Sequence, residues 1–61
     1  MSGQVRKYEY GYVPDNCDIW VRDETMEFGF VYARDLREAR ALAWDAIPYG
    51  YTVCMTREVF R

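Results

Sequence analysis

The chain has 61 residues, of which 51% are hydrophobic and 18% aromatic, with eight basic side chains, ten acidic side chains and no histidine. This mix predicts a single folded domain over residues 1–61, and no apolar run reaches the roughly 20 residues of a membrane span. Without histidine, and with one serine at position 2, histidine-based triads and metal sites are excluded. We therefore expect no enzyme, no metal and no cofactor, with an Asp/Glu pair as the one catalytic arrangement left open.

The expected compartment is the cytoplasm, because no apolar secretion signal follows the first residues. Two cysteines, Cys17 and Cys54, are too few for a cysteine zinc site. In a reducing compartment we expect both to remain thiols. The strand pattern described below also places them on opposite faces of a sheet, which disfavours a disulfide.

Residues 13–17 predict a tight hairpin loop, because Pro14 presets the first turn position and Asn16 tolerates a left-handed conformation. The loop would pair residues 8–13 with residues 17–22. Since side chains alternate along a strand, the hairpin divides into two faces. The aliphatic face holds Val13, Cys17, Ile19 and Val21, and the aromatic face holds Tyr8, Tyr10, Tyr12, Asp18, Trp20 and Arg22.

A third strand is expected from Met26 to Tyr32, after a turn at residues 23–24. Its apolar side chains join the aliphatic face, because a register shifted by one residue would bury Glu27 there. Gly29 then falls on the aromatic face, where we expect the ring of Trp20 to cover it.

Asp35 predicts a helix N-cap, and Glu38 completes a capping-box pair. The helix is expected over residues 36–47, where alanine and leucine are frequent, and it ends before Pro48. One stripe of it is apolar and faces the sheet, with the members Leu36, Ala39, Leu42, Ala43, Ala46 and Ile47.

A last strand is expected from Tyr51 to Phe60, parallel to the first and third strands. The predicted fold is thus α+β, in the order β-β-β-α-β. It has one mostly antiparallel four-stranded sheet with a single helix on its aliphatic face. If the helix instead covers the tyrosine face, the aliphatic face must be buried elsewhere, most simply in a homodimer.

Three sets of side chains are left over once this fold is built: the uncovered aromatic face, Trp44 on the helix flank, and acidic residues around the second strand. Each has a structural alternative. The tyrosines can stabilise a wetted sheet face, Trp44 can close the core with Arg40 stacked on it, and acidic residues are ordinary in turns. The candidate partner-binding residues are Tyr8, Tyr10, Tyr12, Trp20, Arg22, Asp15, Asp18, Asp23, Glu24, Glu27 and Trp44.

The function that these features favour is a non-enzymatic binding protein that acts through protein–protein contact. Acidic loops and the aromatic face would dock on a basic surface, such as that of a nucleic-acid-binding protein. Inhibitors of the phage or mobile-element type, anti-CRISPR or anti-restriction-like, work in this way. The alternatives are single-stranded nucleic-acid binding through the aromatic face, which the net charge of −2 disfavours, and a small regulatory or antitoxin-like subunit.

Overall fold

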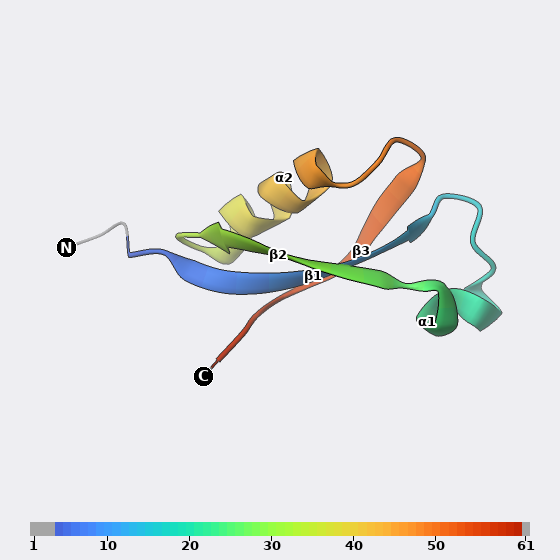
Figure 1. Ribbon diagram of the computed structural model, residues 1–61, viewed down its shortest axis with the longest axis horizontal. Coiled ribbons are helices and arrows are strands. Elements are labelled where there is room, and N and C mark those ends of the chain that lie inside the picture. Colours follow the sequence, from blue (N-terminus) through green and yellow to red (C-terminus); the bar gives the residue numbers. More distant parts are fainter. Residues whose placement is uncertain (1–3, 61) are drawn as a thin grey trace.

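The computed structural model describes residues 4–60, without the side chains of Ile19 and Asp23. Three strands, two α-helices and one short 3₁₀ helix follow in the order β1 (Arg6–Pro14), η1 (Ile19–Val21), α1 (Arg22–Thr25), β2 (Glu27–Ala33), α2 (Leu36–Ala46) and β3 (Tyr51–Glu58) (Figure 1). The sheet order is β2-β1-β3, and both outer strands run antiparallel to β1. Among the described helices, none is long and apolar enough to span a bilayer.

The expected second strand is wrong, and the sheet has three strands in place of four. A turn does form, since Cys17 N donates to Pro14 O at 3.0 Å. Asn16 is not left-handed in it, because the positive φ among the described residues belongs to Gly50. Asp18 then diverts the chain: its Oδ1 accepts from Trp20 N at 3.0 Å, and its carbonyl accepts from Val21 N at 3.0 Å. Such local side-chain bonds offer the backbone an alternative to a strand ladder. They start the η1 turn, so β2 pairs directly with β1.

The last strand was also expected in the wrong place. β3 does run parallel to β2, the strand before the helix, but the two are not neighbours. β3 pairs antiparallel with β1, on the side of β1 away from β2. The register shifts between Gly11, which pairs with Met55, and Tyr12, which pairs with Val53. Cys54 is therefore the extra residue of a β-bulge. Its Sγ lies 3.4 Å from the carbonyl oxygen of Gly11.

Helix α2 covers the tyrosine face of the sheet, which corrects the expectation that it packs on the aliphatic face. Tyr8 is 3% exposed and packs with Ala33 and the fully buried Ala39. The reason is volume. Large rings on β1 fill the space under an alanine stripe, while β2 offers Gly29 and Ala33 on the same face. Bulky side chains opposite small ones give the density of a protein core.

The predicted ends of α2 are confirmed to within one residue. Asp35 Oδ1 accepts a hydrogen bond from Glu38 N at 2.8 Å, and Glu38 Oε1 accepts one from Arg34 N at 2.8 Å. The two side chains thus satisfy backbone donors at the start of the helix. After the helix, Gly50 takes a positive φ of 91°, which turns the chain into β3.

Candidate functional site

The face of the sheet opposite α2 carries a row of exposed aromatic side chains. Alternate residues of β2 supply Phe28, Phe30 and Tyr32, which are 54%, 52% and 63% exposed. We call these three the aromatic strip. The open face, of which the strip is a part, comprises Lys7, Glu9, Gly11, Val13, Met26, Phe28, Phe30, Tyr32, Thr52, Met55 and Arg57.

Two methionines meet over the middle of the open face. A Cβ on Gly11 would lie 2.5 Å from Met26 Sδ and 3.0 Å from Met55 Cγ, so both side chains rest on the bare backbone of the central strand. The side chains come from the start of β2 and from β3. Methionine is flexible and polarisable, and it is common on surfaces that adapt to a partner.

The charges of the open face nearly cancel. Arg57 Nη2 lies 2.9 Å from Glu9 Oε1, and its Nε donates to the same oxygen at 3.0 Å. Lys7 Nζ lies 4.5 Å from the centre of the Phe30 ring, a cation–π contact. Among the described residues the face is therefore apolar in its middle, with Glu9 paired and one further positive charge, that of Lys7, outside the ion pairs.

The tyrosines that were predicted to bind a partner lie on the other face, against α2. Tyr8 and Tyr10 do share one face with Tyr12, but both are buried and unavailable for binding. Tyr12 is half-buried, and its ring centre lies 5.8 Å from that of Tyr10. Its hydroxyl donates to Glu27 Oε1 at 3.4 Å. Partial burial, together with the carboxylate of Glu27, raises the pKa of Tyr12 above its ordinary value of 10.0.

Trp20 and Arg22 were expected beside the tyrosines on the second strand, and they lie in η1 and α1 instead. The Trp20 side chain is 87% exposed and does not cover Gly29. That glycine is covered by the ring of Tyr10. The structure therefore separates these two residues from the tyrosines that were predicted to accompany them.

The acidic residues are gathered at one end of the sheet, between the end of β1 and the start of β2 (Figure 1). Asp15 accepts a hydrogen bond from Thr52 Oγ1, and Asp18 caps η1. Glu24 and Glu27 are exposed. The side chain of Asp23 lies outside the described part of the chain.

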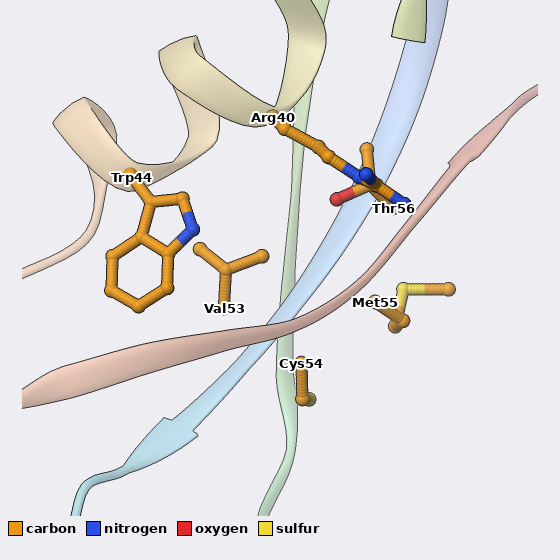
Figure 2. A pocket seen from close by; sticks show the side chains of 6 residues that line it. All are labelled: Arg40, Trp44, Val53, Cys54, Met55 and Thr56. Carbon is orange, nitrogen blue, oxygen red and sulfur yellow. The ribbon is translucent and has the colours of Figure 1, made fainter. Parts of the chain in front are cut away.

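Trp44 lies beside a groove at the β3 edge. The groove is lined by Arg40 and Trp44 from α2 and by residues 53–56 of β3, and its volume is about 220 Å³. Figure 2 shows the side chain of Arg40 extending toward Thr56 and away from the indole ring. The predicted stacking of Arg40 on Trp44 is therefore wrong.

The aromatic strip and the two methionines belong to the candidate binding surface, but they were not predicted to lie there. Their shared face was predicted, but it was assigned to the core. A usable signal was present: Gly29 and Ala33 fall on the tyrosine face, and an alanine-rich helix needs small residues opposite it to pack closely. That pattern assigns the helix to the tyrosine face and leaves the phenylalanines uncovered.

Within residues 4–60, Asp23 aside, no three His, Cys, Asp or Glu side chains gather into a set of potential metal ligands. Comparisons of the chain with protein-family models, with curated proteins and with solved structures gave no match. The site is therefore interpreted from its own geometry.

Proposed function

We propose that this protein is a non-enzymatic binding protein that contacts another protein through its open face. The observation that carries the proposal is the aromatic strip, whose three large side chains stand half or more in solvent on a sheet face that α2 does not cover. Exposed apolar patches of this kind mark interaction sites in soluble proteins, and aromatic residues are enriched at interfaces.

The total surface supports the same conclusion. The chain exposes 4901 Å², whereas a compact monomer of 7.3 kDa exposes about 4,200 Å². The radius of gyration of 12.4 Å also exceeds the roughly 10.5 Å of a compact domain of this length.

The acidic end of the sheet supports a partner with a basic surface. Asp18 and Glu24 are exposed in the segment that leads into β2, the strand that carries the aromatic strip. Glu27 is exposed at the start of the same strand, on its tyrosine face. Acidic side chains at the border of an apolar patch would steer the approach to a positively charged protein. An inhibitor of the anti-CRISPR or anti-restriction type that occupies a nucleic-acid-binding protein would use such a contact. In this proposal the protein acts in the cytoplasm, where Cys17 and Cys54 remain thiols.

The proposal is tested by photo-crosslinking in the native host, with a benzophenone amino acid in place of Phe30 and, as the matched control, in place of Tyr49, which is exposed between α2 and β3. We expect a specific crosslinked protein from position 30 only, and its loss when Phe28→Glu is added. Equal crosslinking from the two positions would contradict the proposal. A crosslink between two copies, together with a dimer mass in light scattering, would identify the partner as this chain itself.

Single-stranded nucleic-acid binding is the second candidate, and the Lys7–Phe30 contact favours it. A row of exposed rings with a cation beside it is the arrangement on which bases stack. The net charge of −2 and the Glu9–Arg57 pair oppose it, because phosphate contacts dominate such affinity. Fluorescence anisotropy with labelled ten-nucleotide strands at low salt separates the two candidates, since the protein-binding proposal expects no binding there.

A further inference from the structure

The groove at the β3 edge has two walls of different kinds. One wall is the side of α2 that carries Arg40 and Trp44, and the other is formed by residues 53–56 of β3. Figure 2 shows the indole ring of Trp44 beside Val53 and the guanidinium of Arg40 beside Thr56. Trp44 is 51% exposed, so half of its side chain is available to a ligand.

β3 is an edge strand, because the sheet order is β2-β1-β3. Its outer backbone groups therefore have no partner strand within the described chain. Such an edge is a template for a further strand. Four consecutive residues of β3 line the groove, so the groove follows the strand and suits a ligand that runs alongside it.

The helix wall of the groove is positive. The ion pairs among the described residues involve Arg6, Arg34 and Arg57, which leaves the exposed Arg40 without a carboxylate partner there. Arg37 precedes Arg40 by about one turn and lies on the same side of the helix, at about 100° per residue. The acidic residue nearest to Arg40 in sequence, Glu38, is rotated by about 160° from it and pairs with Arg34. Asp45 is rotated by about 100° from Trp44. An arginine fork binds a carboxylate with two parallel hydrogen bonds.

We infer that the groove binds an extended peptide segment of another protein. The segment adds to the edge of β3 as a strand, and it places an acidic side chain at Arg40 and an apolar side chain against Trp44. In this mode the main-chain hydrogen bonds supply affinity, and the pockets for alternate side chains supply specificity. The groove includes none of the aromatic strip and none of the acidic end, and it shares only Met55 with the open face, so the inference goes beyond the proposed function and does not depend on it.

A library of linear ten-residue peptides displayed on phage tests the inference with a defined probe. We expect enriched sequences that alternate acidic and apolar residues. The best peptide is then titrated against a Trp20→Phe variant, in which Trp44 is the only tryptophan, and its emission is followed. We expect the emission to shift on binding, and Arg40→Glu to weaken binding at least ten-fold. Arg22→Glu, an exposed arginine in α1, is the matched control and should leave the affinity unchanged.

Two N-methylated copies of the same peptide test the strand geometry. Alternate amides of an edge-bound strand point to β3 and the others point away, so methylation of one set should abolish binding and methylation of the other set should preserve it. The inference is overturned if both copies bind equally, if Arg40→Glu binds as the parent does, or if no peptide is enriched. If the protein is a dimer that dissociates on Arg40→Glu, the groove binds a second copy of this chain, and the inference is also overturned.

Discussion

The ring of Tyr10 lies on the backbone of Gly29, so that a Cβ at position 29 would sit 2.5 Å from the tyrosine hydroxyl oxygen and 2.6 Å from Cζ. The two residues are direct partners on β1 and β2. Because Tyr10 is only 8% exposed, its ring cannot move aside freely. The glycine is therefore part of the packing between β1 and β2 on the tyrosine face.

Gly29→Ala should lower the free energy of unfolding by about 1–3 kcal/mol, since the added methyl group forces the ring of Tyr10 from its position. Urea denaturation followed by circular dichroism measures the change. Tyr10→Leu removes the ring atoms that the new methyl group would meet, so the double variant should lose less than the sum of the two single variants. Additive losses would contradict the contact.

Ala43→Leu should destabilise the fold by about 1–3 kcal/mol, because Ala43 is fully buried between α2 and the sheet. Ala41 is exposed on the same helix and is the matched control, so Ala41→Leu should change stability by less than about 0.5 kcal/mol. Thermal unfolding of both variants gives the comparison. Equal losses would indicate that the helix does not pack through its alanine stripe.

Phe28→Asp should leave the protein folded, at a cost of about 1 kcal/mol, because the side chain stands in solvent on an outer strand. Tyr8→Ala should cost about 3–5 kcal/mol, enough to unfold a domain of this size. Far-ultraviolet circular dichroism of the two variants decides which face is the core. An unfolded Phe28→Asp beside a folded Tyr8→Ala would reverse the assignment.

Asp35→Ala should lower the free energy of unfolding by about 1 kcal/mol, because the backbone N–H of Glu38 loses the Oδ1 that accepts its hydrogen bond at 2.8 Å. Asp35→Asn keeps an acceptor oxygen at the same position and should be nearly neutral. Chemical denaturation of the three proteins at neutral pH measures both effects. A loss of equal size in the asparagine variant would assign the effect to charge.

Stability should fall above pH 10 in a way that depends on Tyr12. Its folded-state pKa is raised from 10.0 by partial burial and by Glu27, so the unfolded chain ionises first. The contribution of Tyr12 is fully present below pH 10 and is lost as the pH rises through the folded-state pKa. The free energies of unfolding of the parent and of Tyr12→Phe are measured between pH 8 and pH 11. If both fall equally with pH, the loss of stability does not come from Tyr12.

Local signals in the sequence predicted several elements correctly. Asp35 and Glu38 fixed the start of α2, and the alternation of side chains grouped Phe28, Phe30 and Tyr32 on one face of a strand. These predictions succeed because capping bonds and strand parity depend only on neighbouring residues.

Two predictions failed because they depended on competition between distant or alternative contacts. Residues 17–22 have the alternation of a strand, but the side-chain bond from Asp18 to the backbone favours a helical turn. Which sheet face packs against α2 depends on how well side-chain volumes fill the space between helix and sheet. The Tyr8 ring packs against the small Ala39, although the phenylalanines of the other face are more hydrophobic. The binding surface was therefore expected on the wrong side of the sheet, although an uncovered aromatic face was itself expected.

The position of β1 at the centre of the sheet has a consequence for how the chain folds. β1 leaves the ribosome before both of its neighbours, and the Glu9–Arg57 bond joins residues 48 positions apart. A nascent chain that ends before β3 therefore carries a central strand with one unsatisfied edge. Folding must wait until β3 has been synthesised, and loop closure over this separation makes the final step slow relative to helical domains of equal length.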